Sequence, residues 1–231
     1  ENNFSVLYDH HLSKTLLWQS GAGGGGKLIT TYETATVNDA EKEVSPFKKS
    51  SPYGNLFTGI SWTPVAKINL KANAATGVRV PNLAELSSDG LHEGIFVYEI
   101  GNPDLKNEKV ISGNLEFNYT GKTLMFKLSP FINLYTDYVY LAIVDEEWYG
   151  FPVNRYKQQD VTQWGAELEL DYRLMRNLSL DFSCSGMDSR RSDGRYTPYV
   201  PAVRYKPAVR YTLQKISRPL PGVCSLNWKV V

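Results

Sequence analysis

The sequence lacks the features by which several large classes of protein are recognised. Cysteine occurs only twice in 231 residues, which is too few for a disulfide scaffold. Lys plus Arg is 25 and Asp plus Glu is 24, so no charge excess favours nucleic acid or an anionic surface as a partner. No run of 18 apolar residues occurs, which excludes a transmembrane helix. Strands that cross a membrane are not excluded, because their hydrophobicity is hidden in alternation.

Helical periodicity is almost absent, and alternation with a period of two residues takes its place. In the stretch QWGAELELDY, residues 163–172, Glu167, Glu169 and Asp171 alternate with apolar residues. This pattern predicts a strand with one polar and one apolar face. With 15 Tyr and 13% aromatic residues, the composition also favours an all-β fold. The same alternation recurs in segments 67–74, 114–119, 124–134, 178–185, 203–213 and 223–230.

Short and long connections alternate along the chain. In an antiparallel up-and-down meander of about nine strands, this places every short turn at one end and every long loop at the other. A bacterial outer-membrane barrel has that asymmetry, whereas a β-sandwich has no reason to keep it. The expected short turns lie near 63–65, 120–122, 174–177 and 214–221, and the expected long polar segments at 10–54, 77–107, 142–154 and 188–202.

Two environments can explain the two faces of the strands. A small soluble barrel turns its apolar face inward as a core, and a wide membrane barrel turns it outward to lipid while polar residues line the lumen. The alternating loop lengths favour the membrane barrel, in which Glu167, Glu169 and Asp171 face the lumen. Candidates for aromatic residues at the lipid–water interface are Trp62, Trp164, Tyr172 and Trp228.

Two of the expected strands are longer than a bilayer requires. Segments 123–141 and 155–173 each run for about 19 residues, while about 9–11 tilted residues span the lipid. We expect the excess to project beyond the bilayer on the side of the long loops. Pro130 interrupts the first of these segments. Since proline cannot donate a ladder hydrogen bond, we expect a bulge or irregularity there.

The most specific stretch is TGVRVPNLAELSSDGLHEGIFVYEIGNPDLKNEK, residues 76–109. Pro81 ends a ladder because it removes a donor and restricts the preceding residue. The sequence Asn-Pro-Asp at 102–104 has turn chemistry. Arg79 would lie near the rim of a lumen, where Glu85 or Glu108 could pair with it.

This stretch resembles the barrel of TonB-dependent outer-membrane receptors. In that family a strand commonly ends in Gly-Phe-Arg-Ala-Pro-Asn-Leu-x-Glu-Leu, and Gly-Asn-Pro-x-Leu-x-Pro-Glu usually follows. The chain departs from these patterns at Val78, in place of the aromatic residue, and at Asn107, in place of the second proline. The residues that carry the resemblance are Arg79, Pro81, Asn82, Glu85, Asn102, Pro103 and Asp104.

The resemblance implies a part of a barrel of about 22 strands, so residues 1–231 are expected to form a partial barrel domain without its plug domain. It implies active import of a scarce nutrient across the outer membrane of a Gram-negative bacterium. The cargo would be an iron-siderophore, haem, another metal chelate or cobalamin. Energy would come from the inner-membrane TonB complex through the plug. Neither a catalytic residue set nor a resident cofactor is expected. A passive outer-membrane channel and a soluble β-sandwich module for binding or adhesion are the alternatives.

Three further features bear on binding and assembly. His92 and Glu93 lie in one expected external loop and His10 with His11 in another. Imidazole and carboxylate groups bind transition metals, but neither pair is a site alone, and ordinary loop polarity is the simpler explanation. The stretch SGAGGGGK, residues 20–27, lacks the Ser or Thr of a phosphate-binding loop, so a flexible loop tip is expected. On its own, such a partial barrel would have open edges and an exposed apolar face, which predicts either self-association or curling into a smaller sheet.

Overall fold

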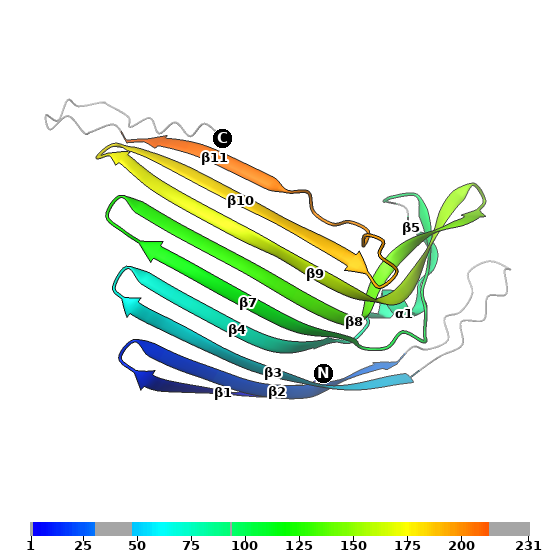
Figure 1. Cartoon of the computed structure of the whole chain (residues 1–231). Helices are drawn as coiled ribbons and strands as arrows, with labels where there is room; N and C mark the ends of the chain where they lie inside the picture. Colours follow the sequence, from blue (N-terminus) through cyan, green and yellow to red (C-terminus); the bar gives the residue numbers. More distant parts are fainter. Residues whose placement is uncertain (1, 31–47, 93, 213–231) are drawn as a thin grey trace, which may run out of the picture.

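The computed structural model describes residues 2–30, 48–92 and 94–212, and most of them belong to one antiparallel β-sheet (Figure 1). Nine strands follow one another across the sheet in the order β1-β2-β3-β4-β7-β8-β9-β10-β11, which confirms the predicted all-β meander. Two short strands lie off this path, where β5 pairs with β6 and β6 runs parallel to β9. The elements are β1 (Asn2–Ser13), β2 (Leu16–Thr30), β3 (Lys48–Val65), β4 (Ile68–Arg79), α1 (Leu83–Ser87), β5 (Asp89–His92), β6 (Val97–Ile100), β7 (Glu108–Thr120), β8 (Leu124–Trp148), β9 (Phe151–Met175), β10 (Leu178–Arg191) and β11 (Arg204–Tyr211).

The sheet is open, with β1 and β11 as its two outer strands in the described part of the chain. Figure 1 shows tight hairpin turns along one end of the strands and most of the longer connections at the other. The predicted asymmetry is therefore present except between β8 and β9: the long polar segment expected at 142–154 is wrong, because these residues continue the two strands to a two-residue turn at 149–150. No helix among residues 2–30, 48–92 and 94–212 is long and apolar enough to cross a membrane.

The sequence prediction was wrong near the N-terminus. Segment 10–54, expected to be one long loop, contains β2 and the start of β3. The glycine-rich stretch 20–27 is not a loop tip, because it pairs with β1 on one side and β3 on the other. A side chain at Gly25 would overlap the Asn2 carbonyl and the Tyr53 ring. Glycine there permits close packing, and it removes the alternation that identifies a strand. One turn is also displaced, since the turn expected at 63–65 lies at 66–67, and another turn, at 14–15, was missed.

The strands β8 and β9 are longer than predicted, at 25 residues each, and they meet in a tight turn at Tyr149 and Gly150. Of the bulge or irregularity expected at Pro130, the bulge is absent, because the register of β8 stays continuous there. The missing N–H instead leaves a gap in the β7–β8 ladder between the pairs Asn114–Phe131 and Phe117–Leu128. The register shifts farther out, around Asp137, a non-glycine residue with φ of 57°.

Cross-strand pairing places the apolar side chains on one face of the sheet and the polar side chains on the other. One row of directly paired residues is apolar or weakly polar from β3 to β11: Trp62, Leu70, Phe117, Leu128, Leu168, Cys184 and Tyr205. The neighbouring row points to the other face and is polar from β4 to β11: Asn69, Asn118, Lys127, Glu169, Ser183 and Lys206. Many large side chains of the apolar face are exposed, including Trp62, Trp164 and Tyr172 at 44%, 57% and 41%. No second layer of the described residues covers that face.

The aromatic residues of the apolar face are placed at two heights along β9. Trp164 and Tyr172 are eight residues apart, which is about 26 Å along a strand. An outer-membrane barrel has an apolar band about 25 Å tall, flanked by aromatic residues. At a strand tilt of about 35–45°, 26 Å along β9 is a height of about 18–21 Å, somewhat less than that band, so the interfacial role of Trp164 and Tyr172 stays a prediction. Trp228 lies outside the described residues.

Candidate functional site

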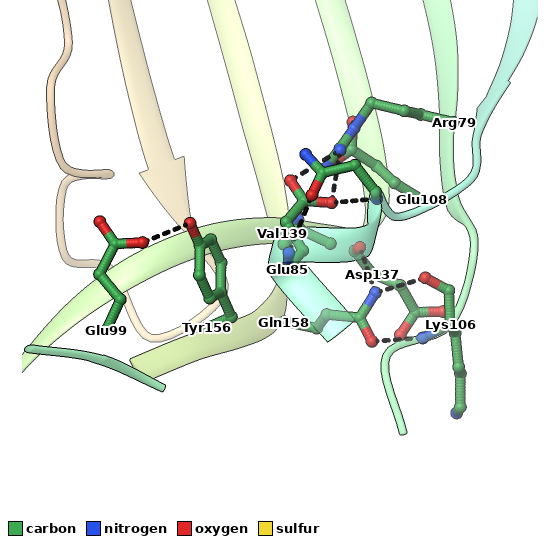
Figure 2. A network of polar contacts seen from close by, with 10 residues as sticks. Arg79, Glu85, Glu99, Lys106, Glu108, Asp137, Val139, Tyr156 and Gln158 are labelled. Carbon is green, nitrogen blue, oxygen red and sulfur yellow. Dashed lines mark hydrogen bonds and ion pairs between the residues drawn. The ribbon is translucent and has the colours of Figure 1, made fainter. Parts of the chain in front are cut away.

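The segment between β4 and β7 is anchored by a cluster of charged side chains, which we call the rim cluster: Arg79, Glu85 and Glu108 (Figure 2). Arg79 is the last residue of β4 and Glu108 is its direct partner at the start of β7. The Arg79 Nη1 atom donates to both carboxylate oxygens of Glu85 at 2.9 Å. Its Nη2 and Nε atoms donate to Glu108 at 3.0 and 3.3 Å. Both pairings considered from the sequence are thus present at once.

The rim cluster stabilises α1 as well as the strand ends. Asn82 is the N-cap of α1: its side chain accepts from the Glu85 N–H at 2.8 Å, and the Glu85 carboxylate accepts from the Asn82 N–H at 2.9 Å. This reciprocal capping box satisfies two backbone donors that a helix start leaves unpaired. The fully buried Pro81 precedes it and ends the β4 ladder. Glu85 therefore serves the helix cap and the ion pair with one carboxylate.

Arg79 also fixes the side of the sheet on which α1 lies. Along β4, Arg79 has the same parity as Lys71 and Asn73, which belong to the polar face. Because Arg79 binds Glu85 of α1, the helix lies over the polar face at the end of the long connections. Glu108 is 8% exposed, and its Oε2 atom also accepts from the Val139 N–H of β8 at 2.9 Å. Three strands and a helix therefore converge on two carboxylates.

The second half of the motif closes the loop around α1. The Asn102 side chain accepts from the Asp104 N–H at 2.9 Å, which forms the predicted turn at 102–104. The Gly101 N–H donates to the main-chain carbonyl of Ser88 at 2.6 Å, and the Asn102 N–H donates to the main-chain carbonyl of Glu85 at 2.8 Å. A Cβ at Gly101 would lie 2.6–2.9 Å from main-chain atoms of Leu86–Ser88. Only glycine fits this close approach of two backbones.

Two residues that the sequence reasoning missed hold this loop to the sheet. Gln158 of β9 accepts from the Lys106 N–H at 2.8 Å and donates to the carbonyls of Lys106 and Asp137 at 2.8 and 2.9 Å (Figure 2). The Lys49 ammonium of β3 donates to the carbonyls of Pro103 and Leu105. Neither residue lies within the motif, and no local pattern distinguishes either of them.

A small apolar core lies beneath the loop. Leu86 and Leu105 are each 1% exposed and pack with Ile29 and Val139, so side chains from α1, the loop, β2 and β8 meet. Val80 and Tyr156 pack against this cluster. Full burial of a leucine side chain stabilises by about 1.5–3 kcal/mol. The rim cluster and this core together fix the connection between β4 and β7 at the end of the sheet that carries the long connections, which we call the outer end.

Farther along β9, the three acidic residues predicted to face a lumen lie on the polar face, and two of them take part in a band of ion pairs. Lys127 lies 3.7 Å from Glu169, its direct cross-strand partner. Asp171 lies opposite Asp181, and Arg210 contacts both, at 4.0 and 2.7 Å. Exposed pairs of this kind contribute about 0.2–1 kcal/mol each. Their main effect is to balance charge along a hydrated surface.

The histidines predicted as metal contacts are at opposite ends of the sheet. His92 ends β5 on the side of the long connections, whereas His10 and His11 lie in β1 near the turn at 14–15. The prediction that His10 and His11 lie in an external loop was wrong, and they cannot share an ion with His92. Glu93 lies outside the described residues. Among residues 2–30, 48–92 and 94–212, no group of three or more His, Cys, Asp or Glu is arranged to hold a metal ion.

An aromatic cluster forms where the β8–β9 hairpin meets β6. The rings of Tyr98 and Trp148 stack with centroids 4.4 Å apart, and those of Phe96 and Phe151 are 6.5 Å apart. Nearby, the Tyr156 hydroxyl donates to Glu99 at 3.2 Å (Figure 2). Burial, with the charge and hydrogen bond of Glu99, raises the pKa of Tyr156 to about 12. The cluster ties β6 to the long hairpin at the outer end of the molecule.

Comparison with known proteins identifies the family. The family model described as "TonB dependent receptor-like, beta-barrel" matches residues 8–228. The chain therefore belongs to this family of receptor β-barrels. A curated relative, the "Iron-regulated outer membrane virulence protein" of Vibrio cholerae serotype O1, is 28% identical over 138 residues, which cover 55% of this chain and 21% of that protein. The family and this relative confirm the predicted outer-membrane location in a Gram-negative bacterium.

Solved structures share the fold at low sequence identity. The copper transporter OprC is 16% identical, with a TM-score of 0.76 over 92% of this chain and 34% of its own. The siderophore receptor PirA of Pseudomonas aeruginosa is 15% identical, with a TM-score of 0.65 over 90% of this chain and 36% of its own. The chain thus spans about a third of these proteins and about a fifth of the curated relative. The family comprises transporters and receptors and is not a class of enzymes.

Proposed function

We propose that this chain forms part of the barrel of a receptor that imports a scarce nutrient across the outer membrane by TonB-dependent active transport. The observation that carries the proposal is the sorting of the sheet, in a chain of this family, into the polar row from Asn69 to Lys206 and the apolar row from Trp62 to Tyr205. A wide membrane barrel needs this arrangement, with water or a plug on one side and lipid on the other. Glu167, Glu169 and Asp171 are proposed to line the lumen.

The proposed cargo is a small metal-containing compound: an iron-siderophore, haem, another metal chelate or cobalamin. The names of the relatives support a metal, since they describe an iron-regulated protein, a copper transporter and a siderophore receptor. Contact between the cargo and His92 or Glu93 is part of this proposal. The metal would be cargo and not a resident cofactor.

The proposed partners follow from the same mechanism. A plug domain would occupy the lumen beside the polar face, and the inner-membrane TonB complex would act on that plug. Membrane lipid would cover the apolar face. The rim cluster has a positioning role in this scheme, because it holds the loop between β4 and β7 at the outer end, where cargo arrives.

A passive channel is the second candidate, because the same polar face could line a pore in which side-chain charges select the solute. The two candidates differ in energy dependence. A soluble β-sandwich is wrong, since the described residues form one sheet within a family of outer-membrane barrels.

The test is growth of a deletion strain on defined sources of iron chelate, haem, cobalamin, copper or zinc at limiting concentration. We expect poor growth on one source, restored by the full-length gene in a host with TonB and not in a host without it. Restoration that is independent of TonB would favour the passive channel. Normal growth of the deletion strain on every source would contradict import of a metal compound.

A further inference from the structure

The end of the sheet that carries the short turns has a row of basic residues. The four described turns lie at 14–15, 66–67, 121–123 and 176–177, and each contains one basic and no acidic residue. All four basic side chains are exposed, and none forms an ion pair within the part of the chain that the structure describes. Adjacent hairpins are about 10 Å apart because strands are spaced by about 4.8 Å. The four residues are Lys14, Lys67, Lys122 and Arg176.

The turns that contain Lys67 and Lys122 are joined directly. The Thr120 N–H, two residues before Lys122, donates to the Lys67 carbonyl at 2.8 Å. Two ammonium groups on long flexible side chains therefore flank one point at the edge of the sheet. Such a pair suits an anion of the size of a phosphate, and lysine binds phosphate as a compact charge with several donors.

A hollow on the apolar face lies close to these two turns. It has a volume of about 480 Å³ and forms around Ala72, where the small side chain leaves a depression between larger neighbours. Ala72 is exposed and points to the same face as its paired neighbours Ile60 and Leu115. The apolar residues around the hollow are Ile60, Trp62, Leu70, Leu115, Phe117, Leu128 and Pro130. Lys71 and Glu116 also border it, but they belong to the polar face, where they form an ion pair with each other.

The distance between the hollow and the turns matches one leaflet of a bilayer. Leu70 follows Lys67 by three residues and Leu115 precedes Lys122 by seven, so the hollow begins about 10 Å and ends about 23 Å along the strands. With a strand tilt of 35–45°, these lengths correspond to a depth of about 8–18 Å. Half of the hydrocarbon core is about 15 Å thick. An acyl chain that extends from a headgroup at Lys67 and Lys122 therefore reaches the hollow.

We propose that this end of the protein binds an anionic phospholipid, with its phosphate between Lys67 and Lys122 and an acyl chain in the hollow around Ala72. The basic row selects the charge of the headgroup, and the apolar lining selects a hydrocarbon. A soluble acidic protein could bind the row of basic residues, but it would leave the apolar hollow empty. Short turns face the periplasm in outer-membrane barrels, so the ligand is a phospholipid of the inner leaflet. The proposal rests on the family's place in the membrane and not on the identity of the cargo.

The experiment uses the full-length receptor, purified in detergent, stripped of lipid and titrated with phosphatidylglycerol or phosphatidylcholine. Bound lipids are counted by native mass spectrometry. We expect phosphatidylglycerol to be retained preferentially. The double variant Lys67→Gln/Lys122→Gln should reduce that retention roughly thirtyfold, because each basic residue at an anionic lipid surface contributes about fivefold. The double variant Lys109→Gln/Lys157→Gln makes the same charge change at the other end of the sheet and should retain the lipid.

A second pair of variants tests the hollow. Ala72→Trp fills it and should lower retention of phosphatidylglycerol, whereas Ala74→Trp, two residues along the same face, should not. Both positions are exposed on the apolar face, and a heat-shift gel confirms that each variant folds. Equal retention of the two lipids, or unchanged retention in Lys67→Gln/Lys122→Gln, would overturn the proposal. So would displacement of the phospholipid by lipopolysaccharide. The growth test of the proposed cargo and this measurement of lipid retention are independent, so a negative result in the growth test does not change the outcome expected here.

Discussion

Arg79 and Glu108 face each other across β4 and β7 with the Arg79 Nη2 and Glu108 Oε2 atoms 3.0 Å apart. Glu85 completes the arrangement, since the same guanidinium binds its carboxylate at 2.9 Å. Removal of the cation leaves two carboxylates that are 9% and 8% exposed without a counter-charge. Arg79 is therefore the cation that both buried carboxylates of the rim cluster share.

Replacement of Arg79 by Met should release the loop between β4 and β7. We expect amide hydrogen exchange at Leu86 and Asn102 to quicken by roughly tenfold to a hundredfold, since a hydrogen bond to a charged group contributes about 1.5–3 kcal/mol. Glu146→Gln is the matched control: it breaks the exposed Glu146–Arg155 pair and should leave these amides unchanged. Equal exchange in both variants would show that the rim cluster does not hold the loop.

Gln158 should act on one loop only. Gln158→Leu removes both hydrogen bonds to the Lys106 backbone, so the Lys106 amide should lose its protection from exchange. Gln159 bonds Ser192 in a different loop, so Gln159→Leu should leave Lys106 protected. If the Lys106 amide keeps its protection in Gln158→Leu as well as in Gln159→Leu, the contact between Gln158 and the Lys106 backbone is contradicted.

Gly101→Ala should disturb packing against α1 because the new methyl group overlaps the backbone of Leu86–Ser88. We expect faster protease cleavage within residues 88–107. Gly90→Ala adds the same group where no heavy atom lies within 4 Å and should be cleaved at the native rate. An unchanged rate for Gly101→Ala would refute the close approach.

The Tyr156 hydroxyl should lose its proton only at an unusually high pH. Its pKa in the folded protein is about 12, above the ordinary value of about 10. The stabilisation linked to its proton is therefore complete below about pH 10 and is lost as the pH rises towards 12. The phenolate absorbance of wild type minus that of Tyr156→Phe should have its midpoint near pH 12, and Glu99→Gln should lower it. A midpoint near that of free tyrosine would contradict the Glu99 contact.

The strands with one polar and one apolar face were predictable because polar and apolar residues alternate with a period of two along the sequence. Glu167, Glu169 and Asp171 share a parity, and no tertiary contact can place them on opposite faces of a regular strand. Arg79 and Glu85 were predictable as partners because Pro81 ends the strand and turns the chain. Sequence alone could not choose between the two carboxylates, and the structure uses both.

Other features depend on partners that are distant in sequence. The glycines of β2 carry no alternation, and only the neighbouring β1 and β3 define that segment as a strand. Gln158 contacts a residue 52 positions away, and Tyr98 stacks on Trp148 of another element. Pro130 weakened one ladder without shifting it, because its register is set by the pairs on both sides.

We propose that the apolar face of this sheet contacts lipid while its polar face contacts water or plug. Spin labels at successive positions 167–171 test this arrangement, in the full-length receptor in lipid vesicles with Cys184 and Cys224 replaced by serine. We expect labels at Leu168 and Leu170 to be relaxed by membrane-dissolved oxygen, and labels at Glu167, Glu169 and Asp171 not to be. If this two-residue period is lost or reversed, the apolar face does not contact lipid.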